Sequence, residues 1–253
     1  MGGSGQDGKP AEERVSFGDI SFEEQDGFQQ PGFADLATFR QGAYRLLAAW
    51  LLYPDESVVE IAADAGRFLR QYDELTAQLA AGGSWRTFLE ACEAIDIGAT
   101  AELQSQYMQL FGGSGGYPAI ALCESGYVRS SDAVAMVSSD VVKSYRDGGV
   151  ALSIREVPDH LAVELEYLSI LCGQEASAWV EDWDRVRPVL ERELRFVRDH
   201  LTRWAPAVAQ QVAERGTSEL YQRHLRAAAD LCAGDSALIA AMMESAGTSG
   251  AGG

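Results

Sequence analysis

The sequence predicts an all-α protein, a single globular helical domain of about ten helices. Apolar residues recur three and four residues apart through most of the chain, which is the spacing of a helix with one buried face. Apolar and polar residues nowhere alternate for long enough to indicate a sheet. A repeat of fixed period is also missing, which argues against a regular solenoid. With 253 residues, of which 47% are hydrophobic, the chain is long enough to bury a substantial core.

Composition divides the chain into three segments. Residues 1–33 are rich in Gly, Gln, Asp and Glu and have no sustained apolar period, so we expect a disordered or loosely docked tail. We expect the helical domain over residues 34–244. Residues 245–253 consist of Ser, Ala, Gly and Thr, and they predict a flexible tail.

Each predicted helix follows from an apolar stripe bounded by residues that start or stop helices. Pro54 and the pair Gly82-Gly83 end the first two stripes, and Ser84 can cap the third helix. Pro206 can begin a late helix, which Gly216 closes. The predicted helices span approximately residues 36–53, 58–81, 84–95, 103–111, 134–147, 158–172, 183–204, 206–215 and 220–231.

Residues 112–118 are the longest loop signal in the body of the chain, with four glycines before Pro118. Glycine lets backbone amides approach phosphate groups, but this loop lacks the Gly-Lys-Ser/Thr ending of a P-loop. It also does not stand in a strand–helix unit of the dinucleotide-binding type. A flexible loop that gates a ligand is therefore favoured over a phosphate-binding loop.

Residues 156–167, with the sequence EVPDHLAVELEY, combine a helix start with four acids and one of the three histidines. Pro158 suits the first turn of a helix, where its missing N–H costs nothing, and Asp159 complements the positive end of the helix dipole. Leucines three and four residues apart indicate that one stripe of this helix faces a core. His160 and Glu164 lie four residues apart on another stripe, which can face solvent or a groove.

The charge of the chain limits its partners. Against 38 Asp and Glu stand 20 Lys and Arg, which gives a formal net charge of -18. So acidic a surface repels nucleic acid and anionic lipid and favours cationic partners, although it is also typical of proteins from a salty cytoplasm. The N-terminus has no secretory signal and no stretch is apolar enough to span a membrane, so we expect a cytoplasmic protein.

Patterns for catalysis or metal binding are weak. The four cysteines are widely spaced, which predicts reduced core thiols rather than a zinc or redox site. His160 and Glu164 can supply two ligands of a helical metal-dependent enzyme, with Glu156 or Asp159 close by, but the sequence does not identify a third ligand. We therefore expect neither metal nor cofactor, and keep the metal-dependent enzyme as an alternative.

Two binding functions are open beside that alternative. A helical body with an acidic surface and a glycine-rich loop can hold a peptide that carries a basic patch and an apolar stretch. The amphipathic run from Trp183 to Trp204 can instead bind another protein, in which case the chain is a helical scaffold.

Three motifs occur in the order and spacing of one known family. They are Tyr107–Gly112 followed by Pro118 and Glu124–Tyr127, then Glu156–Tyr167, and then Phe196–Leu201 followed by Trp204–Pro206. On these motifs the chain resembles the TorD/DmsD family of cytoplasmic chaperones, which help to mature molybdenum-containing oxidoreductases. The similarity runs from about Leu36 to Cys232, so both tails lie outside it.

The resemblance implies a TorD-like all-α fold and a non-enzymatic binding activity. Such chaperones bind the twin-arginine signal peptide, or a related N-terminal segment, of a catalytic subunit and keep it in the cytoplasm until its molybdopterin cofactor is inserted. Whether the client keeps a twin-arginine signal stays open, as does the choice between monomer and homodimer. The implied peptide-binding residues are Asp159 and His160, with Glu156 and Glu124 nearby, Tyr117, Pro118 and Tyr127 in the loop wall, and Glu164 by helical spacing.

Overall fold

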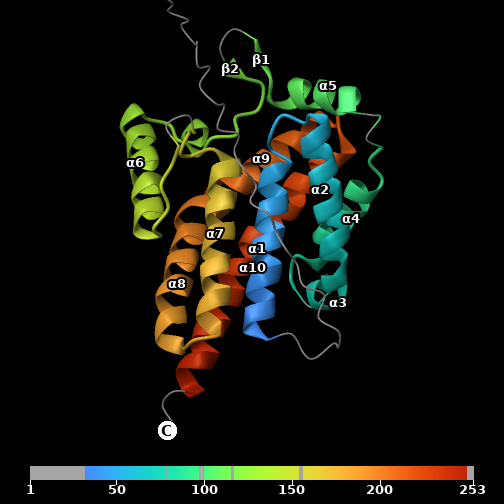
Figure 1. The fold of residues 1–253 in the computed structure, drawn as a ribbon. Coiled ribbons are helices and arrows are strands. Elements are labelled where there is room, and N and C mark those ends of the chain that lie inside the picture. Colours follow the sequence, from blue (N-terminus) through green and yellow to red (C-terminus); the bar gives the residue numbers. More distant parts are fainter. Residues whose placement is uncertain are drawn as a thin grey trace, which may run out of the picture. The chain divides into compact units, whose positions relative to one another are not determined.

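Helix α7 (Leu161–Trp179) lies between α1 (Phe33–Ala49) and α8 (Trp183–Phe196), and its contact with α1 is the most extensive between any two described elements (Figure 1). The computed structural model describes residues 32–77, 79–96, 98, 100–114, 117–153 and 156–249. The predicted N-terminal tail lies outside these residues as far as residue 31, and residues 250–253 lie outside them at the other end.

The all-α prediction is confirmed. Helix α2 continues through a 3₁₀ turn into α3, and α8 continues through a π turn into α9. The described chain therefore has slightly fewer separate helices than the roughly ten predicted. The remaining described elements are α2 (Glu56–Leu69), α3 (Asp73–Thr76), α4 (Gly82–Glu93), α5 (Thr100–Phe111), β1 (Gly113–Ser114), β2 (Tyr117–Pro118), a 3₁₀ turn (Glu124–Tyr127), α6 (Ser131–Asp147), the π turn (Val197–Leu201), α9 (Thr202–Arg215) and α10 (Glu219–Ser249).

The core is built from apolar stripes that face one another across the helices. Trp50, Trp85 and Trp204 are almost completely buried, each from a different helix or helix end. Full burial of one large apolar side chain stabilises the fold by roughly 1.5–3 kcal/mol relative to leaving it exposed. All four cysteines are free thiols and three of them are buried, as predicted for core residues.

The amphipathic run at residues 183–204 turns its apolar face into this core. Val186, Leu190 and Leu201 are completely buried, and Trp204 is 1% exposed. A partner protein therefore has no access to this face. The scaffold hypothesis, which placed the partner there, is wrong.

Helix α4 begins at Gly82, although the sequence predicted that Gly82 and Gly83 would end the preceding helix. A Cβ atom at residue 82 would lie 2.1 Å from the carbonyl oxygen of Thr76, so only glycine permits this close approach of two backbones. Ser84 is not the cap that was predicted, because its hydroxyl donates to the carbonyl of Ala81 at 3.0 Å within the first turn.

Pro206 does not begin a helix, because it lies inside α9. Proline lacks the N–H that would bond to the carbonyl four residues back, and the wider π turn at Val197–Leu201 accommodates this break just before it. Gly216 closes α9 as predicted, with a φ of 64° that favours glycine.

Helix α10 runs to Ser249, so it extends into the segment of residues 245–253 that was predicted to be a flexible tail. It contains no proline, so nothing breaks the helical hydrogen bonds before that point. None of the described helices combines the length and the apolar character that crossing a membrane requires.

The two adjacent glycines of α4 provide a matched test of this packing. We expect Gly82→Ala to lower the free energy of unfolding by roughly 1–3 kcal/mol, because the new methyl group meets backbone atoms. Gly83→Ala has open space around its Cβ. It should raise the free energy of unfolding by up to about 1 kcal/mol, through helix propensity alone. Urea unfolding followed by circular dichroism measures the free energy of unfolding of both variants. Equal effects of the two substitutions would contradict the close backbone approach at Gly82.

Candidate functional site

The segment before and within the 3₁₀ turn Glu124–Tyr127 is hydrogen-bonded to the turn that precedes α7. The N–H of Leu161 donates to the carbonyl of Leu122 at 2.8 Å, and the N–H of Glu124 donates to the carbonyl of Asp159 at 2.9 Å. Cys123 and His160 form an antiparallel bridge between these bonds. Two of the motifs recognised in the sequence therefore form one unit of structure.

His160 is the N-cap of α7. Its Nδ1 accepts a hydrogen bond from the N–H of Ala162 at 3.2 Å, so the helix begins at Leu161. The prediction that Pro158 and Asp159 lie in the first turn was wrong, because they form the turn before the cap. Burial lowers the pKa of His160, with Asp159 acting in the opposite direction, and a neutral ring suits the acceptor role of Nδ1.

Asp159 ties the two motifs together from inside the protein. Its Oδ2 accepts a hydrogen bond from the N–H of Ser125 at 2.8 Å. The residue is 2% exposed, and Glu164 is completely buried. The expectation that the stripe of His160 and Glu164 faces solvent or a groove was wrong for Glu164, because partners far away in the sequence surround it.

Those partners come from the π turn and from α9. His200 Nδ1 lies 2.8 Å from Glu124 Oε2, and Trp204 Nε1 donates to Glu164 Oε2 at 3.3 Å. Both aromatic residues lie in the third motif that carried the family resemblance. The sequence assigned neither His200 nor Trp204 to this site, because nothing in it pairs them with acids 40 and more residues away.

The group of Glu124, Asp159, Glu164 and His200 is here called the inner acidic cluster, and it brings three carboxyl groups together with one imidazole. Burial raises the pKa of Glu164 well above its ordinary value, and the charges of Glu124 and Asp159 raise it further, while the bond from Trp204 lowers it. Within the described chain, Oε1 of Glu164 has no hydrogen-bond partner. The surroundings of Glu164 therefore favour its protonated form over the carboxylate.

The remaining predicted site residues lie around this cluster. Tyr127 donates to the carbonyl of Ala121 at 3.0 Å, and its ring packs on Trp204 with the centroids 5.5 Å apart. Glu156 is half-buried, and its carboxylate accepts a bond from the N–H of Ser153 at 3.0 Å. Tyr117 and Pro118 form β2, but their side chains lie outside what the structure describes.

A second buried group of acids surrounds Arg40 of α1. The guanidinium donates to Asp235 of α10 at 2.8 Å and also bonds to Glu175 of α7 and Glu193 of α8. Asp235 also accepts a bond from the hydroxyl of Tyr44 at 2.7 Å. Burial lowers the pKa of Arg40, but the surrounding acids outweigh it and the pKa stays above its usual value.

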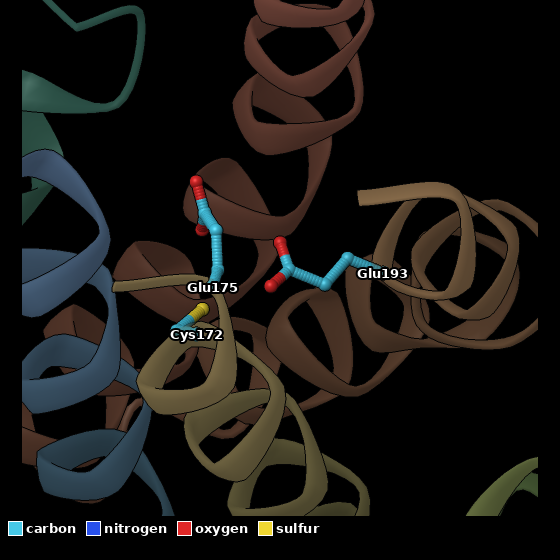
Figure 2. Close-up of side chains that lie close together, drawn as sticks. All are labelled: Cys172, Glu175 and Glu193. Atoms are coloured by element: carbon cyan, nitrogen blue, oxygen red, sulfur yellow. The ribbon is translucent and has the colours of Figure 1, made fainter. Parts of the chain in front are cut away.

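Two acids of this second group and a neighbouring cysteine form a trio that resembles a metal site. Figure 2 shows Cys172 and Glu175 on one helix, with Glu193 reaching toward them from another, and their ligand atoms all lie within 4.8 Å of one another. Two features argue against a metal ion there. Arg40 already binds both carboxyl groups, and burial raises the pKa of the Cys172 thiol, whereas metals bind the thiolate.

The metal-dependent alternative based on His160 and Glu164 gains no third ligand. Across the described ranges, the trio just considered is the one group of three His, Cys, Asp or Glu side chains close enough to share an ion, and it contains neither residue. The acceptor role of His160 Nδ1 at the helix N-terminus also occupies one of its two nitrogen atoms.

Comparison with known proteins identifies the family. A family model described as the nitrate reductase delta subunit matches residues 74–210, more than half of the chain. The chain belongs to this family. Its resemblance to the TorD/DmsD group of maturation chaperones is thereby confirmed.

Two relatives have informative names. The selenate reductase assembly chaperone protein of Thauera selenatis is 32% identical over 127 residues, which cover 49% of this chain and 64% of that protein. The chlorate reductase assembly chaperone protein of Ideonella dechloratans is 31% identical over 118 residues, which cover 46% of this chain and 60% of that protein. The similarity thus covers less than two thirds of either relative.

The segment that matches the nitrate reductase delta subunit model contains all residues of one of the two buried clusters. Residues 74–210 include every member of the inner acidic cluster and also Trp204. Arg40 and Asp235 lie outside the match, so the second cluster combines matched and unmatched parts of the chain.

We expect the free energy of unfolding of this protein to depend on pH through Glu193. Burial raises the pKa of Glu193 from 4.5 to about 8, although Arg40 opposes the shift. Between these two values the folded protein holds the proton more tightly than the unfolded chain, so stability decreases as pH rises. We expect Glu193→Gln to remove this loss, so that the variant gains on the order of 3 kcal/mol relative to wild type between pH 5 and pH 8.

Urea unfolding at half-unit pH steps measures this difference. Glu191→Gln is the matched control, because Glu191 lies on the same helix but pairs with Arg187 at the surface. Its stability difference from wild type should not change over this range. A pH-independent difference for Glu193→Gln would show that Glu193 is ionised in the folded protein.

Asp159 offers a test of the link between the motifs. Asp159→Ala leaves the N–H of Ser125 without its partner, and we expect a loss of about 1–3 kcal/mol together with faster proteolysis within residues 119–127. Asp159→Asn keeps an acceptor oxygen and should lose less. If Asn and Ala lower the free energy of unfolding equally, the hydrogen bond to Ser125 does not stabilise the segment.

Proposed function

We propose that this protein is a client-specific maturation chaperone for a molybdenum-containing oxidoreductase. It binds the N-terminal segment of the catalytic subunit, of the twin-arginine type or a related one, and keeps that subunit in the cytoplasm while its cofactor is inserted. It performs no catalysis itself and acts as a monomer or homodimer.

The observation that carries this proposal is membership of the nitrate reductase delta subunit family, together with two relatives named as reductase assembly chaperones. The net charge of -18 supports it, because an acidic surface attracts a basic peptide and repels nucleic acid. Neither buried cluster provides a nucleophile paired with a base in an open cavity, which acyl or phosphoryl transfer would need.

The burial of the acids assigns different tasks to the proposed site residues. Asp159, Glu124 and Glu164 hold the segment of residues 119–127 in place from beneath. His160 and Glu156 are half-buried and reach the surface beside it. Tyr127, Tyr117 and Pro118 belong to the loop wall that takes the apolar part of the peptide.

A titration tests the proposal directly. The ligand is a fluorescein-labelled peptide of 30 residues that carries a twin-arginine motif followed by an apolar stretch. We expect wild type to bind it, and the double variant Asp159→Ala/His160→Ala to bind about tenfold more weakly because the loop wall is displaced. Fluorescence anisotropy gives the dissociation constant, and client activity after co-expression gives maturation.

The control variant is Asp64→Ala, which removes an exposed acid from α2 that lies at the surface beside Arg67. It should bind the peptide like wild type. If wild type shows no binding, or if the double variant binds the peptide and matures the client normally, the assigned function or site is wrong.

A further inference from the structure

Two hollows lie along the outer side of α7 and meet at Ile170. The upper one is a cavity of about 110 Å³ between α7, the end of α6 and the segment that follows it. The lower one is a groove of about 670 Å³ that runs past Gly173 and Ser177 to Glu181. Ile170 lines both and is 38% exposed.

The lining residues of α7 occupy one face of the helix. Val163, Glu166, Ile170, Gly173 and Ser177 follow one another at three or four residues, which places them on a single stripe. From residue 163 to its end at residue 179 the helix rises by about 24 Å, which is the length of about seven residues of extended peptide. We call this stripe and its two hollows the α7 trough.

The upper cavity combines two acids with aromatic walls. Glu156 and Glu166 line it together with Tyr145 and Tyr167. Burial raises the pKa of Glu166, the charge of Glu156 raises it further, and Arg45 acts in the opposite direction but does not outweigh them. Both carboxyl groups line this cavity, whereas in the second buried cluster Arg40 bonds to all three carboxyl groups.

A guanidinium group fits this chemistry better than other cations. It is planar, it bonds to carboxylates through two parallel N–H groups, and its flat face stacks on an aromatic ring. A cavity of about 110 Å³ has room for one long side chain and excludes a helix. The residue next to that arginine would then lie over Ile170, which offers an apolar surface.

We propose that the α7 trough binds the client's N-terminal segment, with one arginine between Glu156 and Glu166 and an apolar side chain over Ile170. This inference rests on the proposed function and specifies where the basic part of the peptide binds. A second copy of this chain is a poorer occupant, because two chains with a net charge of -18 repel each other.

The trough also explains how the peptide can be held although Asp159 is buried. Asp159 already accepts the N–H of Ser125 and is 2% exposed, so an incoming arginine cannot reach it while the segment of residues 119–127 stays docked. Glu156, three residues earlier, is half-buried and lines an open cavity.

The experiment uses the full chain and the same labelled 30-residue peptide. We expect Glu156→Gln/Glu166→Gln to raise the dissociation constant about tenfold, and Ile170→Asp to raise it by a similar factor. The matched control is Glu60→Gln/Glu90→Gln, which removes the same charge from exposed positions on α2 and α4 and should change binding less than twofold.

A second peptide, with citrulline in place of each arginine, isolates the charge pairing. Citrulline keeps the shape of the side chain and loses its charge, so wild type and the Glu156→Gln/Glu166→Gln variant should bind this peptide equally. A tenfold difference that persists with citrulline would overturn the proposal, because the two acids would then act on the fold and not on an arginine.

Three further outcomes separate this inference from the proposed function. If the peptide binds wild type and the Glu156→Gln/Glu166→Gln variant equally, the trough proposal fails while the chaperone function stands. If wild type does not bind the peptide, both fail. If sedimentation shows a dimer that Ile170→Asp dissociates, a second copy occupies the trough and the proposal is overturned.

Discussion

The fold depends on Arg40, a completely buried cation that bonds to acids on three other helices. Removing Arg40 would leave three buried carboxyl groups without a cation, which costs far more than a surface ion pair gains. The same arrangement fixes how α7, α8 and α10 lie against α1, because one carboxyl group from each of them must reach the single guanidinium of Arg40. Helix α7 is thereby fixed at its inner face, while its outer face lines the two hollows of the α7 trough.

Both buried clusters contain more acids than cations, and in each of them burial acts on one carboxyl group. Burial raises the pKa of Glu193 in one cluster and of Glu164 in the other. Each of these carboxyl groups has one oxygen atom without a hydrogen-bond partner in the described chain. The clusters differ in what they join: the Arg40 cluster joins helices, whereas the inner acidic cluster joins a loop to a helix start and to the π turn.

Periodicity predicted the helices well, because every described helix buries one stripe and the spacing of that stripe is written in the sequence. Helix ends were predicted less well, since a glycine pair can either end a helix or permit a close backbone approach, as Gly82 does beside Thr76. The site could be predicted only as a region. Burial of Asp159 and Glu164 depends on His200 and Trp204, whose positions are set by the packing of the π turn and α9 on α10 and not by any local pattern.

The acids of the EVPDHLAVELEY stretch therefore have two separable roles. Those that point inward, Asp159 and Glu164, shape the loop and are shielded from any peptide. Those that point outward, Glu156 and Glu166, line a cavity that a cationic side chain can enter. Glu164 and Glu166 lie only two residues apart in α7, and this spacing places their side chains on different faces of the helix. An acidic motif that looks uniform in sequence is thus divided by the fold into a buried half and a half that lines a cavity, to which we assign the proposed binding of arginine.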